Sequence, residues 1–187
     1  MLKRIRYNSP VVLTFVIASF LVLVLNYLTQ GLSNSLFFSV YSTGAYFDPL
    51  MIVRLFGYVL GHANLEHYIS NMTFILLIGP MLEEKYGSKN LLTLMLITTV
   101  VTGIVHMLFF KGALLGASGI VFAMIMLSSI VYCRKDEIPL TFLIMAVIYL
   151  GGQVIDGLFV YDSVSQFGHL VGGLIGSAYG FSVNSKR

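Results

Sequence analysis

The sequence predicts an all-α membrane protein: a bundle of six transmembrane helices that forms a single polytopic domain over residues 1–187. Three observations predict it. Of the 187 residues, 57% are hydrophobic and only 10% are charged, whereas soluble domains carry roughly 25% charged residues. The charges divide the chain into apolar runs of about 16 to 23 residues, near the ~20 that cross a bilayer as a helix. Lysine and arginine gather in alternate connections between these runs.

The apolar runs give the order of the helices. They are expected at residues 10–29, 65–82, 90–110, 117–133, 139–156 and 166–183. In lipid the backbone must satisfy its own hydrogen bonds, which favours helices, and the strands of a barrel would instead give shorter alternating segments. Segment 31–64 is expected to be an outer loop that lies in the membrane interface with partly helical structure. The composition excludes a soluble enzyme, a disordered chain and a nucleic-acid-binding module.

The first helix and the orientation follow from the charges. Lys3, Arg4 and Arg6 precede the first apolar run, as in a signal peptide, but no small-x-small cleavage site follows the run, so we expect a retained helix. Six helices place both termini on one side. Nine of the 11 lysines and arginines lie on that side, against Arg54 and Lys111 on the other. This asymmetry predicts that both termini are cytoplasmic.

Unusual polar residues stand at the outer ends of three helices that run in the same direction. They are His67 and Asn71 in 65–82, Gly116-Ala117-Ser118-Gly119 at the start of 117–133, and Gly168-His169 in 166–183. Polar residues inside a membrane are costly and often mark a functional site. Three sets at one depth therefore predict a site at the outer end of the bundle.

Each set also has a structural interpretation. His67 and Asn71 share a helix face and could only join helices by hydrogen bonds. Ser118 could be an ordinary helix cap, although a helix N-terminus also favours a developing oxyanion. The motif is not the elbow of soluble hydrolases, which needs a preceding strand. Gly172, which begins a stripe of small residues after His169, would let another helix approach closely.

Together the residues supply the parts of a serine hydrolase. A neutral histidine, His169, could activate Ser118, while His67 and Asn71 could stabilise an oxyanion. Glu66 and Asp156 could each orient a histidine as in a triad. We favour a dyad, because Glu66 adjoins His67 and points elsewhere, and Asp156 is expected at the water-facing end of its helix.

A larger pattern covers about residues 50 to 180. It consists of His67-x-x-x-Asn71, Glu84-Lys85-Tyr86-Gly87, Gly116-x-Ser118-Gly119 and Gly168-His169-x-x-Gly172, in this order. It resembles the rhomboid family of intramembrane serine proteases, in its minimal six-helix bacterial type. The resemblance implies a multi-pass protein of the bacterial plasma membrane, with a Ser–His dyad in a water-filled cavity that opens to the outer side, and substrates that are single-span membrane proteins.

The resemblance also implies a role for each matching residue. Ser118 would be the nucleophile and His169 the general base, and His67, Asn71 and the Ser118 backbone N–H would form the oxyanion hole. Supporting positions would be Gly116, Gly119, Phe122 and Gly172, with the Phe122 ring packed on the base histidine. Glu84 would have a structural role. No cofactor, metal or nucleic-acid partner is implied, and the oligomeric state stays open.

One motif departs from the family pattern. Family members often have Trp-Arg in the first outer loop, whereas here Val53 precedes Arg54 and the protein has no tryptophan. Other aromatic residues of the loop could anchor it in the interface instead, namely Phe37, Phe38, Tyr41, Tyr46 and Phe47.

Three alternatives remain. The first is a catalytically inactive rhomboid-like protein that binds and escorts membrane helices. The second is a metal-dependent enzyme or carrier that uses His62, His67, His106 and His169, although no His-Glu-x-x-His occurs. The third is a small transporter, although paired broken helices are not evident. The single cysteine, Cys133, excludes a disulfide framework and a cysteine-based metal site.

Overall fold

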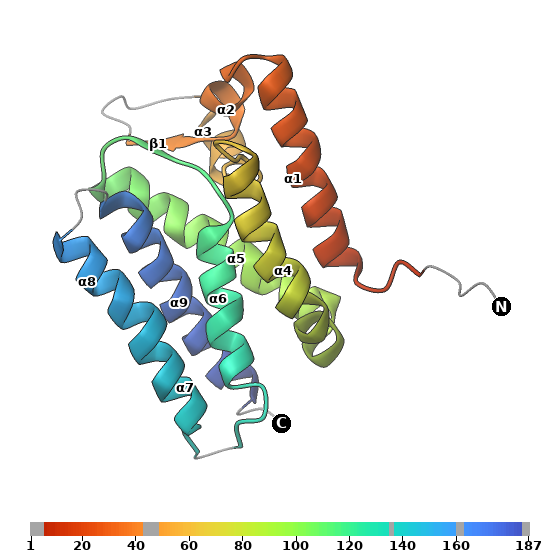
Figure 1. Ribbon diagram of the computed structural model, residues 1–187, viewed down its shortest axis with the longest axis vertical. Helices are drawn as coiled ribbons and strands as arrows, with labels where there is room; N and C mark the ends of the chain where they lie inside the picture. The colour runs from red at the N-terminus through yellow and green to blue at the C-terminus, as the bar shows by residue number, and fades with distance from the viewer. Residues whose placement is uncertain (1–5, 43–48, 135–136, 160–162, 185–187) are drawn as a thin grey trace.

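The computed structural model describes residues 6–42, 49–134, 137–159 and 163–184, and of residues 156–159 and 163–165 only the backbone. This part of the chain is mostly helical (Figure 1). The helices are α1 Pro10–Leu28, α2 Leu32–Phe37, α3 Met51–Gly57, α4 Leu65–Tyr86, α5 Ser88–Phe109, α6 Ser118–Ser129, α7 Leu140–Met145, the π-helical turn η1 Ala146–Leu150, α8 Gly151–Phe159 and α9 Ser163–Asn184. Two short strands, β1 Val40–Tyr41 and β2 Ala113–Leu114, pair antiparallel.

Helices lie over all six expected segments, with three main differences. α4 continues to Tyr86, four residues past the predicted end, and α6 ends at Ser129 rather than at residue 133. The segment predicted as 139–156 consists of α7, η1 and α8, so a π-helical turn interrupts it. No sequence signal predicts this turn, because a π-helical turn leaves the apolar composition unchanged.

Only some of these helices have the length and hydropathy of a membrane span on their own. Among the described residues, Pro10–Leu28 and Ser88–Phe109 meet both criteria, and Ser118–Ser129 and Leu140–Ile155 are shorter apolar helices. α4 has enough residues but carries Glu66, Glu83, Glu84 and Lys85, which lower its mean hydropathy. Length and hydropathy therefore leave the count of six spans as a prediction.

α6 is the central helix of the bundle. Figure 1 shows it between α4 and α9, with α7 and α8 beside α9 and α1 beside α4. Ile120, Met124 and Leu127 are at most 1% exposed. The helix is apolar on every side, as expected for a helix surrounded by protein. Its 12 residues span only about 18 Å, less than the ~30 Å of a hydrocarbon core.

α9 packs closely along α6 because glycines form the contact. A Cβ atom at Gly172 would overlap the backbone of Gly119, and one at Gly176 would overlap the backbone of Ala123. One at Gly180 would overlap the side chain of Ile130. The small-residue stripe on α9 therefore lies against α6, and the two backbones approach more closely than any larger residue would allow.

A buried carboxylate holds the start of α1 against the end of α4. Glu83, 5% exposed, accepts hydrogen bonds from the backbone N–H groups of Val11 and Val12 at 3.0 and 3.1 Å. The Ser88 hydroxyl donates to the same carboxylate at 2.7 Å. Helix N-termini have unsatisfied N–H groups and favour negative charge. The structural role expected of Glu84 thus belongs to Glu83, and Glu84 is exposed.

We predict that Glu83→Ala destabilises the protein by about 2–4 kcal/mol, since hydrogen bonds to a charged group contribute roughly 1.5–3 kcal/mol each and the loss leaves buried donors unpaired. Glu84→Ala, one residue along the same helix, should change the free energy of unfolding by less than about 0.5 kcal/mol. Thermal unfolding in mild detergent compares the two. Equal shifts for both variants would contradict the assignment.

The outer loop is anchored through Arg54 and the strand pair. Arg54 Nε donates to the Leu36 carbonyl at 2.8 Å, and its guanidinium lies 5.4 Å from the Tyr41 ring centroid. Val40 pairs with Leu114 of β2. The loop is thus fixed to the segment that precedes α6, without a tryptophan. Of the five aromatic residues expected in the interface, Tyr46 and Phe47 lie outside the described residues.

Candidate active site

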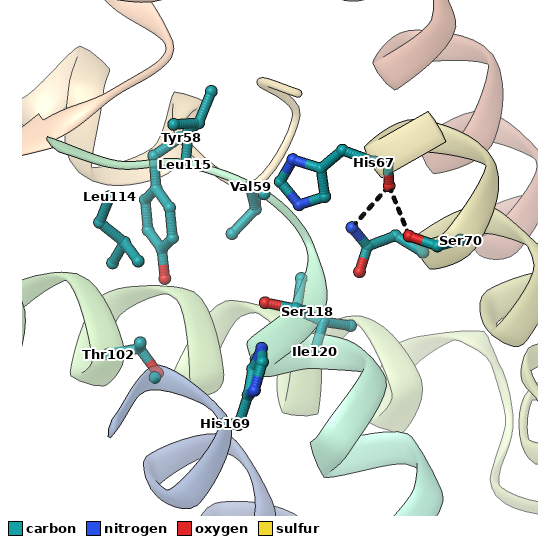
Figure 2. Close-up of a pocket in the computed structure, with 14 residues that line it drawn as sticks. Tyr58, Val59, His67, Ser70, Thr102, Leu114, Leu115, Ser118, Ile120 and His169 are labelled. Carbon is teal, nitrogen blue, oxygen red and sulfur yellow. Dashed lines mark hydrogen bonds between the residues drawn. The ribbon is translucent and has the colours of Figure 1, made fainter. Parts of the chain in front are cut away.

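A cavity of about 320 Å³ lies where the N-terminal parts of α4, α6 and α9 converge. Four predicted polar residues line it: Ser118, His169 and His67, which Figure 2 labels, and Asn71. The glycines Gly116, Gly119 and Gly168 line it as well. The remaining walls come from Tyr58, Val59, Ser70, Thr102, Leu114, Leu115 and Ile120. The structure therefore brings together three sets of residues that are up to about a hundred positions apart in the sequence.

Ser118 is the first residue of α6. Gly116 precedes it with φ +116°, a conformation that favours glycine, and its N–H donates to the Tyr58 carbonyl at 2.9 Å. The first hydrogen bond within α6 runs from the Val121 N–H to the Ala117 carbonyl at 3.0 Å. The N–H groups of the first turn precede this bond, so they are donors at a helix N-terminus beside the Ser118 hydroxyl. A two-residue strand does precede the motif, but it belongs to a two-stranded ribbon and not to the sheet of a soluble hydrolase.

His169 lies in the second turn of α9 and lines the same cavity as Ser118 (Figure 2). Its ring stacks on Phe122 with centroids 4.3 Å apart and planes inclined by 4°. This is the contact that the family resemblance implied for Phe122. The Nδ1 atom of His169 lies 2.6 Å from Oε1 of Gln153, a residue of α8. The imidazole is thus held on one face by an aromatic ring and at one nitrogen by an amide.

His67 presents a donor to the cavity. Its Nδ1 accepts a hydrogen bond from the Ala63 N–H at 3.4 Å, so in the neutral ring the proton is on Nε2. That Nε2 adjoins Gly116, where a Cβ atom would lie 2.7 Å away. The backbone N–H of His67 donates to the side-chain oxygen of Asn64, which caps the N-terminus of α4. The cap and the glycine together place the ring at the edge of the cavity.

Asn71 lies one turn further along α4 and is 5% exposed. Its Nδ2 donates to the His67 carbonyl at 2.9 Å. A carboxamide carries two N–H groups, so a second donor is left on the same nitrogen. Nδ2 also lies 4.0 Å from the point that a Cβ on Gly116 would occupy. Asn71 therefore borders the same part of the cavity as His67.

His62 contacts the His67 ring but does not line the cavity. It is completely buried, its Nδ1–H donates to the Leu60 carbonyl, and its own carbonyl accepts from the Asn34 side chain. Burial, and secondarily the nearby His67, lower the pKa of His62 to about 4. The ring is therefore uncharged at neutral pH and supports the loop and the His67 ring, which lies edge-on at 5.0 Å.

The other candidates do not gather at the cavity. Glu66 is exposed, and the side chain of Asp156 lies outside the described part of the chain. His106 is buried and its Nε2 bonds to the Gly112 carbonyl at 3.2 Å. Within the described residues, no group of three histidine, cysteine, aspartate or glutamate side chains is placed to hold a metal ion.

Sequence reasoning did not single out Gln153 or Tyr58. Gln153 is the only amide residue in the apolar run 138–155, and a polar residue inside a span is itself a signal of function. Tyr58 is 3% exposed, and its hydroxyl donates to the Thr99 carbonyl at 3.0 Å. Nothing in the local sequence distinguishes Tyr58 from the other aromatic residues of the outer loop.

Comparison with known proteins gives consistent relatives. A family model described as the Rhomboid domain matches residues 49–186. Rhomboid-like protease 3 of Toxoplasma gondii is 35% identical over 122 residues, which are 63% of this chain and 46% of that protein. Rhomboid protease GlpG of Haemophilus influenzae is 25% identical over 171 residues, which are 87% of this chain and 86% of that protein.

A further relative, the rhomboid protease GlpG of Salmonella newport, is 24% identical over 151 residues, which are 75% of this chain and 54% of that protein. The chain thus spans about half the length of the Toxoplasma and Salmonella relatives and most of the length of the Haemophilus one.

Proposed function

Because the chain belongs to the rhomboid family, we propose that it is an intramembrane serine endopeptidase that cleaves membrane-protein substrates within or near their transmembrane helix. One observation carries the proposal: Ser118, at the N-terminus of α6, and His169, on α9, line one cavity. The Gly119–Gly172 contact and the Phe122 ring support the position of His169. The named relatives, which are proteases, support the same activity.

In the proposed mechanism, Ser118 Oγ attacks the carbonyl carbon of the scissile peptide and passes its proton to His169. The negative charge that develops on the carbonyl oxygen is stabilised by His67, Asn71 and the Ser118 backbone N–H, which are donors at one edge of the cavity. His169 then protonates the leaving amine. Water from the outer side hydrolyses the acyl-enzyme, with His169 again as the base.

The proposed substrate is a single-span membrane protein that approaches from the lipid, between α4 and the helix formed by α7, η1 and α8. A helical peptide bond is shielded from attack, so the substrate helix must unwind locally. Residues that weaken helices, such as glycine and proline, should favour cleavage. A small residue before the cut is expected from the family.

We further propose that residues 1–187 form one polytopic domain of six spans with both termini in the cytoplasm, in a bacterial plasma membrane. The distribution of lysine and arginine supports this orientation. The short α6 supports a site reached by water from the outer side, because a helix of 12 residues covers only about 18 Å of the ~30 Å hydrocarbon core, which leaves room for water above its N-terminal end.

A fluorophosphonate probe, which reacts with activated serines, tests the proposal. Purified wild type in mild detergent should be labelled, whereas Ser118→Ala and His169→Ala should not. Ser128→Ala is the matched control, because Ser128 lies on the same helix and its hydroxyl donates only along that helix, to the Ile125 carbonyl. No labelling of well-folded wild type would instead favour the inactive protein that binds membrane helices.

Asn71→Ala should lower kcat by about 10²–10³-fold with little change in KM, because an oxyanion donor acts mainly in the transition state. Thr73→Ala on the same helix is the control, since its exposed hydroxyl donates to the Ile69 carbonyl. The measurement is steady-state cleavage of a single-span reporter in detergent. An unchanged kcat would remove Asn71 from the oxyanion hole.

A further inference from the structure

Gln153, a residue of α8, contacts the imidazole of His169. Its Oε1 lies 2.6 Å from Nδ1, a short hydrogen bond between partners 16 residues apart. The motifs shared with the family do not include this position. Both side chains are partly buried, and of the two only His169 is among the residues that line the cavity.

The fold holds Gln153 at this place through two adjacent glycines of α9. Gly172 faces Gly119 of α6, while a Cβ atom at Gly173 would overlap the side chain of Leu150, the last residue of η1. One helical turn after His169, α9 is therefore in close contact with α6 on one side and with η1 on the other. Gln153 follows η1 by three residues, and the π-helical turn sets the face on which it lies.

The chemistry of the two groups defines the direction of the bond. A carboxamide oxygen can only accept, so Nδ1 of His169 must carry a proton. In the neutral ring Nε2 is then unprotonated, and it is the one nitrogen that can accept the Ser118 proton. We propose that Gln153 is a positioning residue that fixes this tautomer and holds the ring toward Ser118. The inference rests on the proposed function.

The same bond would act during the reaction. When Oγ attacks, the serine proton moves to Nε2, and the Nδ1 proton remains shared with Gln153. The imidazolium thus keeps an acceptor for its second N–H without a buried carboxylate. Among the described residues that line the cavity with His169, the titratable side chains are Tyr58 and His67. Tyr149 of η1 packs edge-on against the Phe122 ring.

Two variants of Gln153 separate this role from packing. Gln153→Glu keeps the shape and adds a negative charge next to the imidazolium, so the acid limb of the kcat/KM profile should move to higher pH by about 1–3 units. Gln153→Leu removes the acceptor, so kcat should fall at least about tenfold with KM within about twofold, and the acid limb should move to lower pH. A role in packing alone predicts no movement of the acid limb for the Leu variant, so that variant decides between the two roles.

The control and a second readout complete the test. Val154→Leu alters the neighbouring residue, which is 48% exposed, and should leave the profile unchanged. In ¹⁵N-histidine NMR, with His169→Ala to assign the signal, wild type should show Nδ1 protonated and Nε2 bare, and Gln153→Leu a mixture of tautomers. If wild type cleaves but the Gln153 substitutions change neither the acid limb nor the His169 tautomer, the positioning role of Gln153 is wrong and the proposed function stands. If wild type neither cleaves nor is labelled, the proposed function fails.

Discussion

Cleavage of a single-span reporter should fall by at least about 10³-fold in both Ser118→Ala and His169→Ala. Members of a nucleophile–base pair act as a unit, so the loss of either removes nearly the whole chemical step, and the double variant should be no worse. The structure explains why the losses should match. Both side chains line one cavity, and the described part of that cavity contains no second serine at a helix N-terminus.

The two alanine variants should otherwise resemble wild type. Ser118 and His169 are both partly exposed in the cavity, and the α6–α9 contact is made by glycine backbones that the substitutions leave in place. Thermal unfolding should therefore shift little, and Ser118→Ala should still bind the reporter. If Ser118→Ala cleaves at the wild-type rate, the dyad is wrong. If it neither cleaves nor binds, its loss of activity reflects a damaged site.

Those experiments concern a site whose members could be named from the sequence. His67, Asn71, Ser118 and His169 were found because each is polar at the outer end of an apolar run, and a polar residue in a membrane helix stands out. The glycine stripe of α9 was found for a similar reason, because small residues at helical spacing indicate a close helix contact.

Other features depend on helix phase, which the sequence does not reveal. Adjacent residues on a helix point about 100° apart, so the family pattern indicated Glu84 while the structure buries its neighbour Glu83. Gln153 meets His169 only because η1 alters the register of its helix and Gly173 admits Leu150. The β1–β2 pair joins segments that are about seventy residues apart, and two-residue strands have no periodicity to detect.

Gly172→Val should have the second-largest effect, because it acts on both the fold and the dyad. A Cβ atom at this position would overlap the carbonyl oxygen of Gly119, and backbone cannot rotate aside as a side chain can. We expect a loss of about 3 kcal/mol or more in the free energy of unfolding, at the upper end of overpacking. We also expect a loss of cleavage of at least about 10²-fold, since His169 lies one turn away and a displacement of about 1 Å is that costly.

Two further variants make the Gly172 result interpretable. Ala178→Val adds similar bulk to the same helix at an exposed position, so both stability and cleavage should stay near wild type. Gly119→Ala crowds the α6–α9 interface less, because its Cβ atom would lie 3.4 Å from the carbonyl oxygen of Gly168. This variant should fold, with activity reduced about tenfold. Fluorophosphonate labelling should fall in the same order as cleavage, since both depend on the distance between His169 and Ser118. Wild-type labelling in Gly172→Val would mean that the α6–α9 contact does not position the dyad.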